Sequence, residues 1–404
     1  MKKVYLDYNA TTPLDKRVIE SMLPYLDERY GNPSSIHSFG MAGKAALDEA
    51  REQVAGLVGA LPKEIVFTSG GTESNNAAIV GAAMGFRDKG AHLITTAVEH
   101  ASVLETFRYL EGQGFRVTYL GVDGEGLIDL DELRDSITEE TLLVSVIYVN
   151  NETGVISPIE EIAEIVKERG PGGAQGAKGV LFHTDAVQAA GKLPIDLASL
   201  PVDLLSLSSH KVYGPKGVGA LFVRSGLKLP AYVHGGGQER GRRSGTENVP
   251  GIVGFGRACE LVREGYGEEA ERIKTITSRL EGAVFESIDG VELNGRPDGR
   301  VANTINVRFE GVEGEAVVMS LDLDGVAVST GSACSEGNVD PSHVLLAMGL
   351  TKVEALSSVR ISTGRFTTEE EVARALELLP AVVRRIRSVG SMGEAGEGTV
   401  DLPG

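Results

Sequence analysis

Short apolar runs recur along the first half of the chain, and segments with helical spacing separate them. The apolar runs are typical of strands that are buried on both faces, because they lack polar alternation. Strands of this kind that alternate with helices indicate a mostly parallel sheet covered by helices. The predicted strands are residues 65–68, 92–95, 115–120, 142–149, 180–184, 203–207 and 220–223, and the predicted helices are 15–26, 43–58, 72–84, 101–110, 131–137 and 159–169. We therefore predict an α/β fold in which a large domain, residues 15–260, holds a mostly parallel seven-stranded sheet.

The pattern changes near Glu260. A long charged helix, about residues 256–288, is followed by shorter elements of both kinds. The predicted strands are 304–309, 326–329 and 359–363, and the predicted helices are 313–323 and 368–386. This order favours a smaller α+β domain formed by residues 1–14 and 261–387. The final segment, 388–404, is glycine-rich and acidic, and we expect it to be a disordered tail.

Composition and charge narrow the class of protein. The chain has 404 residues, which suffices for two domains with buried cores, and its formal net charge of −18 argues against a protein that mainly binds nucleic acids or anionic membranes. Its two cysteines cannot form a disulfide framework, so we expect a reducing cytoplasm. The first residues lack the apolar core of a signal peptide, and no apolar run is long enough to span a bilayer.

Chemistry is expected just after the strands, because sheets of this kind bind ligands beyond the carboxyl ends of their strands. After the first strand comes the turn Ser69–Asn76, in which glycines and hydroxyls open a helix. Free N–H groups and the helix dipole make this turn a candidate phosphate site, and simple N-capping is the alternative. The turn contains neither G-x-G-x-x-G nor a Walker lysine, so a nucleotide site is weakly supported.

Polar residues follow three further strands. His100 could stack on a flat ring or could only begin a helix, and Asn151 could bind a phenolic or carboxylate oxygen or serve as a turn residue. Asp185, at a buried strand end, needs a cationic or hydrogen-bonding partner, which a protonated pyridine nitrogen would supply. His183 and Asp185 could instead bind a metal, but no zinc-type spacing supports that alternative.

Lys211 lies at the end of a predicted buried strand, between hydroxyls and glycines of the stretch Ser206–Gly219. A desolvated lysine loses its proton more easily and can attack an aldehyde, whereas a surface lysine on a turn is the alternative. A lysine, an acid, ring-binding groups and a phosphate site at one sheet edge are the set that pyridoxal phosphate requires.

Cys334 lies among small polar residues that form loops, as a reactive thiolate would, whereas Cys259 lies in an apolar helical stretch and is predicted to be core. A cysteine protease with His343 as base is the alternative, but nine residues along one segment is an improbable geometry for such a pair. Arg360, in a strand between apolar residues, needs an anion. A substrate carboxylate and a structural salt bridge are the two candidates.

Taken together, these segments resemble the NifS/IscS-type cysteine desulfurases, which are enzymes of the class V aminotransferase group with PLP fold type I. The resemblance covers almost the whole chain, and its segments are 5–13, 31–37, 69–76, 99–100, 149–152, 183–188, 206–219, 234–246, 331–334 and 358–360. Two segments depart from it, the glycine-rich residues 170–179 and the tail after Ile386, and they leave the sulfur acceptor open.

The resemblance implies roles for individual residues and a homodimer. Lys211, Cys334 and His100 would be catalytic, and Arg360 with Asn151 would bind the substrate L-cysteine. The residues that would bind pyridoxal 5'-phosphate are Gly71, Thr72, His100, Asn151, Asp185, Gln188, Ser208, His210, Lys211 and, from a second subunit, Thr246. Sulfur would leave as a persulfide on Cys334, in the loop of about residues 330–341, for an iron–sulfur scaffold or a tRNA-thiolation protein. A selenocysteine lyase, another class V enzyme and a non-enzymatic adaptor are the alternatives.

Overall fold

The computed structural model describes residues 3–169, 179–331 and 340–394, and the chain divides into two compact units. The larger unit comprises residues 9–151 and 155–268, and the smaller comprises 1–8, 152–154 and the residues from 269 onward. The larger unit therefore contains residues 9–14 and 261–268, which the sequence pattern assigns to the smaller domain. None of the helices in the described ranges is long and apolar enough to cross a membrane.

The larger unit is built on a seven-stranded sheet, which confirms the predicted α/β class. The strand order is β2-β8-β7-β6-β5-β3-β4. Strand β8 runs in the direction opposite to that of the other six strands. The strands are β2 (Ile65–Thr68), β3 (His92–Thr96), β4 (Arg116–Leu120), β5 (Thr141–Ile147), β6 (Leu181–Asp185), β7 (Leu204–Ser208) and β8 (Gly219–Val223). Because β3, β5, β6 and β7 are parallel, their carboxyl ends share one edge of the sheet.

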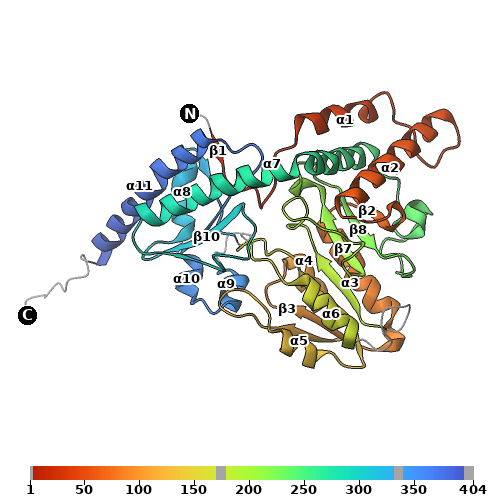
Figure 1. Cartoon of the computed structure of the whole chain (residues 1–404), viewed down its shortest axis with the longest axis horizontal. Coiled ribbons are helices and arrows are strands. Elements are labelled where there is room, and N and C mark those ends of the chain that lie inside the picture. The colour runs from red at the N-terminus through yellow and green to blue at the C-terminus, as the bar shows by residue number, and fades with distance from the viewer. Residues whose placement is uncertain (1–2, 170–178, 332–339, 395–404) are drawn as a thin grey trace, which may run out of the picture. The chain divides into compact units, whose positions relative to one another are not determined.

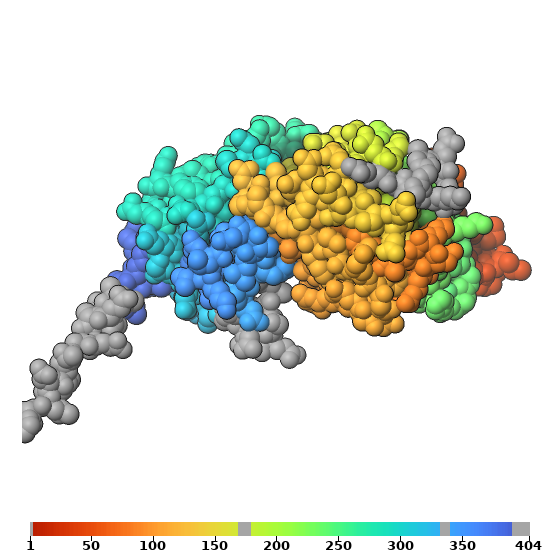
Figure 2. All heavy atoms as spheres, turned by 90° about the horizontal axis from the view of Figure 1, so that it is seen from below, coloured from red at the N-terminus to blue at the C-terminus, as the bar shows by residue number. Residues whose placement is uncertain are grey.

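The helices that precede α7 (Val249–Ser287) in this unit are α1 (Lys16–Leu26), α2 (Ser38–Leu57), α3 (Gly71–Gly85), α4 (Ala101–Gly112), α5 (Leu130–Ser136) and α6 (Ile159–Arg169). Helices α2 to α6 contact strands of the sheet (Figure 1). Helix α3 packs across β5 to β8, and its Ile79 shares a core with Phe107 of α4 and with Leu93 and Leu143 of the sheet. Figure 2 shows the orange and yellow segments that include α4 to α6 covering much of this unit in that view. Burying each such side chain contributes about 1.5–3 kcal/mol.

The smaller unit has its own core. An antiparallel sheet β12-β10-β9, formed by Ser358–Ser362, Thr304–Phe309 and Val291–Leu293, lies in the same unit as the parallel pair β1 (Val4–Tyr5) and β11 (Val326–Ala327). Its helices are α8 (Gly314–Leu323), α9 (His343–Ala347), α10 (Lys352–Leu356) and α11 (Glu369–Glu394). The apolar core includes Phe309, Leu321 and Leu379.

Helices α7 and α11 extend furthest beyond their predicted bounds, and α2 begins at Ser38, before the predicted start at residue 43. Helix α7 (Val249–Ser287) begins before residue 256, and Asn248 Oδ1 accepts a hydrogen bond from Gly251 N at 3.2 Å. Asn248 followed by Pro250 is a typical start of a helix. The predicted start at about residue 256 rests on the spacing of apolar residues alone and therefore misses this signal. Helix α11 continues to Glu394, so the expectation of a disordered tail from residue 388 is wrong for 388–394. Helical propagation adds one backbone hydrogen bond per residue and does not require an apolar face. Residues 395–404 lie outside the described ranges.

Glu99 joins the carboxyl ends of β3 and β5. Its side chain is fully buried, and its Oε1 accepts hydrogen bonds from Thr96 Oγ1 and Ile147 N, each at 2.8 Å. Burial raises the pKa of Glu99 to about 8, because the ionised form is poorly solvated, and the charge of Asp185 adds to this effect. The carboxyl group is therefore mainly protonated at neutral pH.

Replacing Glu99 with glutamine should change how stability depends on pH. Glu99 has a pKa of about 8 when folded and about 4.5 when exposed, so between these values the folded state holds a proton that the unfolded state has released. This contribution to stability is present at low pH and is lost as pH rises towards 8, by about 1.4 kcal/mol per pH unit. The free energy of unfolding of Glu99→Gln, measured with urea, should therefore rise relative to that of the parent protein by about 1.4 kcal/mol for each pH unit between pH 5 and 8. The exposed Glu105→Gln is the control, and equal slopes in both variants would contradict the assignment.

A buried ion pair fixes the loop that precedes α7. Arg51 of α2 donates from Nη1 and Nη2 to the two carboxylate oxygens of Glu239, at 2.8 and 2.7 Å, and Phe67 N donates to the same carboxylate at 2.9 Å. The side chains of Arg51 and Glu239 are 10% and 3% exposed. The pair holds Glu239 in the left-handed region, at a φ of 47°, which is unfavourable for a residue with a Cβ.

Truncating this pair on one side should be costly. Glu239→Ala leaves the buried guanidinium of Arg51 without its counter-charge, and we expect a loss of about 3–5 kcal/mol in the free energy of unfolding, measured with urea. Asp48→Ala removes the partner of Lys44 in an exposed pair and should cost less than about 1 kcal/mol. Comparable losses in the two variants would show that the buried pair contributes no more to the free energy of unfolding than the exposed pair does.

Candidate active site

The carboxyl edge of the sheet gathers most of the predicted site residues of the larger unit. Asp185 and Ser208 are the last residues of β6 and β7, and Lys211 ends the short 3₁₀ helix Ser209–Lys211 that follows β7. His100 begins α4 after β3, and Gly71 begins α3 after β2. The strand-end argument from sequence therefore located these residues correctly in the fold.

Asp185 is buried and is held by hydrogen bonds to both of its oxygens. Val187 N donates to Oδ1 at 3.0 Å, and Asn75 Nδ2 of α3 donates to Oδ2 at 2.7 Å. Only 4% of Asp185 is exposed, so these donors replace the water that a carboxylate would otherwise bind. A partner for Asp185 is predicted from its position at a buried strand end, and the structure identifies Asn75 as one such partner.

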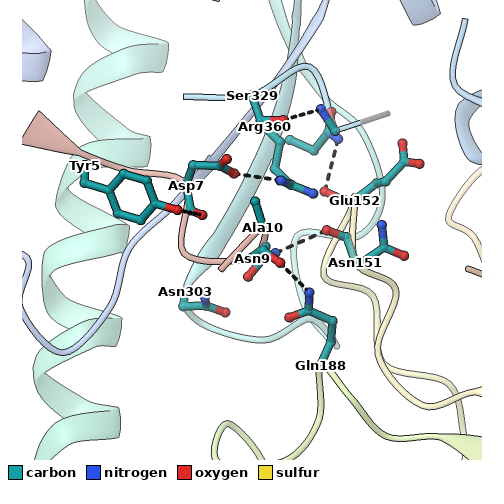
Figure 3. A network of polar contacts seen from close by, with 12 residues as sticks. Tyr5, Asp7, Asn9, Ala10, Asn151, Glu152, Gln188, Asn303, Ser329 and Arg360 are labelled. Carbon is teal, nitrogen blue, oxygen red and sulfur yellow. Dashed lines mark hydrogen bonds and ion pairs between the residues drawn. The ribbon is translucent and has the colours of Figure 1, made fainter. Parts of the chain in front are cut away.

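Lys211 and Gln188 meet at one backbone carbonyl. Lys211 Nζ donates to Asn9 O at 2.6 Å and to Ala10 O at 2.8 Å, and Gln188 Nε2 also donates to Asn9 O, at 2.9 Å. Asn9 Nδ2 in turn donates to Asn151 O at 3.3 Å. Figure 3 shows Asn9 beside Gln188 and Asn151. Asn9 therefore organises three predicted site residues, although the sequence analysis gave it no role.

The start of α3 has the features expected of an anion site. Its N-cap, Gly70, provides no side-chain hydrogen bond, so the simple N-capping alternative is not what the structure shows. A Cβ on Gly71 would lie 2.8 Å from Cγ2 of Val187, so glycine lets the helix begin close to the turn after β6. The N–H groups of a first helical turn and the helix dipole favour a negatively charged ligand. Thr72 is exposed at this position.

Three further residues with predicted phosphate roles differ in exposure, and the first of them, His210, is half-buried. His210 Nδ1 lies 3.1 Å from Thr11 Oγ1, and burial together with the charges of Lys211 and Lys216 lowers the pKa of His210 to about 4. The neutral imidazole can therefore offer one N–H donor. Ser208 is buried. Thr246, for which a role in a second subunit is predicted, is exposed.

His100 has the structural role that was its alternative interpretation. It is the N-cap of α4, where its Nδ1 accepts a hydrogen bond from Ser102 N at 3.1 Å. Ser102 Oγ lies 2.8 Å from the same nitrogen. The side chain is exposed, so capping leaves the ring available, and stacking on a cofactor remains a prediction.

His183 has both ring nitrogens engaged. Nδ1 lies 2.8 Å from Ser145 Oγ, and Nε2 lies 3.0 Å from Ser206 Oγ. Burial lowers the pKa of His183 to about 3, so the ring is neutral. A histidine that is satisfied in this way within the sheet has no nitrogen to give to a metal, which removes the His183–Asp185 alternative.

Arg360 belongs to the smaller unit and forms the structural pair that was its alternative interpretation. Its Nη2 donates to Asp7 Oδ1 at 2.7 Å, as Figure 3 shows, and its backbone pairs with that of Ser329. The side chain is 5% exposed, so this cation is buried against Asp7. Cys334 lies outside the described residues. Cys259 is buried in α7, and burial raises the pKa of its thiol, which agrees with a core role.

Comparison with known proteins extends these observations to the whole chain. Residues 4–375 match the family described as "Aminotransferase class-V". The cysteine desulfurase IscS of Methanosarcina thermophila is 49% identical over 391 residues, which are 97% of this chain and 94% of that protein.

Solved structures agree with this result. A NifS-like protein superposes with a TM-score of 0.88 at 40% identity, covering 95% of this chain and all of that one. SspA in complex with cysteine gives a TM-score of 0.79 at 40% identity, covering 90% of this chain and 100% of that one. With a family match over residues 4–375 and near-full-length relatives of one kind, this chain belongs to the class V aminotransferase family and, within it, to the cysteine desulfurases of the NifS/IscS type.

Proposed function

We propose that this protein removes sulfur from L-cysteine, giving L-alanine and a persulfide on its own Cys334, with pyridoxal 5'-phosphate as cofactor. The observation that carries the proposal is the set of groups at the carboxyl edge of the sheet, in a chain of this family. A lysine amine, a buried carboxylate and a helix N-terminus without a capping side chain occur there together.

The residues present fit this cofactor. Asp185, whose two oxygens are held by N–H donors, would pair with the protonated pyridine nitrogen, and Gln188 with Asn151 would flank the ring oxygen. Lys211 would attach the cofactor. The start of α3 (Gly71 and Thr72), Ser208 and His210 would bind the phosphate group, and His100 would stack on the ring. When bound, the cofactor supplies an electron-withdrawing ring that accepts the electron pair released at the substrate α-carbon.

The chain's own groups would carry the remaining steps. Lys211, near the substrate once displaced from its carbonyl partners, would move the α-proton as a base and then return a proton. Arg360 would bind the carboxylate of cysteine with its planar fork. The Cys334 thiolate would attack the sulfur of the substrate, so that the carbon–sulfur bond breaks and a sulfur–sulfur bond forms. The carbon fragment keeps the electron pair and takes up a proton to become alanine.

A related enzyme for another amino acid, such as a selenocysteine lyase or an aminotransferase, is the second candidate. Cys334 favours the desulfurase, because an aminotransferase has no use for a thiol among small polar residues. We further propose a homodimer, in which Thr246 reaches the phosphate group bound by the second subunit. A cytoplasmic location and transfer of sulfur to an iron–sulfur scaffold or a tRNA-thiolation protein complete the proposal.

The two cysteines allow a matched test of the persulfide. Cys334→Ala should keep the yellow absorbance of the cofactor and lose alanine and sulfide formation from cysteine, because the sulfur acceptor within the chain is gone. Cys259→Ala, at a buried position, should keep activity. Alanine formation would be measured by amino-acid analysis after mixing with cysteine. Full activity of Cys334→Ala would refute the persulfide mechanism, and a parent protein with no absorbance and no alanine would favour the adaptor alternative.

Arg360 can be tested by a change that keeps its charge. Arg360→Lys preserves a cation for Asp7 but loses the planar fork, so we expect KM for cysteine to rise by about 10–100-fold while the cofactor absorbance is retained. Arg365→Lys is the control, because Arg365 Nε pairs with Glu269 Oε2 at 2.7 Å. An unchanged KM in Arg360→Lys would leave Arg360 with a purely structural role.

A further inference from the structure

Asn75 connects Asp185 to His100 through a chain of hydrogen bonds. Its Nδ2 donates to Asp185 Oδ2 at 2.7 Å and to Ser102 Oγ at 2.9 Å. Ser102 Oγ lies 2.8 Å from His100 Nδ1. Asn75 and Asp185 are 1% and 4% exposed, so water has little access to the chain at this end. The network brings together α3, the start of α4 and the end of β6.

The carboxylate determines which way the amide of Asn75 faces. A carboxylate oxygen is only an acceptor, so the nitrogen of the amide, and not its oxygen, must point towards Asp185. Both hydrogens of Nδ2 are then used, one on Asp185 and one on Ser102. Asn75 Oδ1 is buried without a hydrogen-bond partner in the described part of the chain, so the contacts to Asp185 and Ser102 alone set the orientation of the amide. Turning the amide over would place two oxygens against each other.

Ser102 links the amide of Asn75 to the ring of His100 by hydrogen bonds. Its Oγ accepts from Asn75, which leaves its own hydrogen for another acceptor. Its backbone N–H already donates to His100 Nδ1 at 3.1 Å, so that nitrogen carries a lone pair and no hydrogen. The hydroxyl of Ser102 therefore also donates to Nδ1. We propose that Asn75, oriented by Asp185, acts through Ser102 to hold the neutral His100 ring as the tautomer that carries its hydrogen on Nε2.

This inference rests on the proposed function for its significance. If His100 stacks on the cofactor ring, this tautomer places a hydrogen on Nε2. Nδ1 is then occupied as the acceptor of the hydrogen bonds from Ser102 and is not available to take a proton from the substrate. Asn75 and Ser102 are then positioning residues. Asp185, which would face the pyridine nitrogen, would then also determine which nitrogen of the His100 ring carries the hydrogen. One buried carboxylate would thus orient the cofactor ring and the histidine that stacks on it.

The test is to determine the tautomer of His100 by NMR in the full-length holoenzyme with ¹⁵N-labelled histidine rings. His100→Asn identifies the two signals by their loss. In the parent protein we expect Nε2 to carry the hydrogen and Nδ1 to be unprotonated. Asn75→Ala should change the ratio of the two tautomers by about fivefold towards Nδ1–H, which corresponds to the loss of one net hydrogen bond. Ser102→Ala should produce a change of similar size.

The double variant distinguishes a chain from a general structural effect. Because Asn75 acts through Ser102, Asn75→Ala should have no further effect on the ratio when Ser102 is already alanine. Asn76→Ala, whose Nδ2 donates to Thr72 O, is the matched control and should leave the ratio unchanged. Additive effects, an equal change in Asn76→Ala, or a parent His100 protonated on Nδ1 would overturn the inference. Alanine formation by the parent protein is measured in parallel, and its absence would refute the proposed function without altering the tautomer result.

Discussion

The buried carboxylate of Asp185 is the constraint on which the candidate site depends. A carboxylate in this position costs several kcal/mol unless donors replace its water. Here one donor comes from the backbone directly after β6, and the other from Asn75 on α3. The second donor requires α3 to be docked on the sheet, and the same docking places the N-terminus of α3 beside the turn after β6. The features proposed to bind the ring nitrogen and the phosphate group therefore follow from a single packing arrangement.

Asn9 plays a comparable part for the polar groups on the other side of the site. A backbone carbonyl has two lone pairs, and that of Asn9 accepts hydrogen bonds from both Lys211 and Gln188. Its side chain adds bonds to Asn151 O and to Lys192 Nζ, the latter at 2.9 Å. A single residue near the start of the larger unit thus orders segments from three strand ends. The carbonyl groups of Asn9 and Ala10 are neutral acceptors, and they hold Lys211 Nζ in place at these two contacts.

Much of the fold follows from the sequence because apolar runs and helical spacing are local properties. Strands β2 to β8 all lie close to their predicted positions, and Asp185, Lys211 and Ser208 were expected at strand ends for a topological reason. What could not be predicted was pairing between distant residues. Asn75 and Asp185 are 110 positions apart, and Arg360 and Asp7 are 353 apart. No local pattern identifies such pairs, although a buried asparagine such as Asn75 usually has a polar partner close to it.

Two buried carboxyl groups at this edge of the sheet, Glu99 and Asp185, are held by different sets of hydrogen bonds. Glu99 accepts hydrogen bonds from Thr96 Oγ1 and Ile147 N on its Oε1, and burial keeps its pKa at about 8, with Asp185 contributing to the shift. Asp185 instead accepts an N–H on each oxygen. When one of two neighbouring buried carboxyl groups is ionised, its charge raises the cost of ionising the other. The neutral Glu99 links β3 to β5, and Asp185, with a donor on each oxygen, is the carboxyl group proposed to face the ring nitrogen.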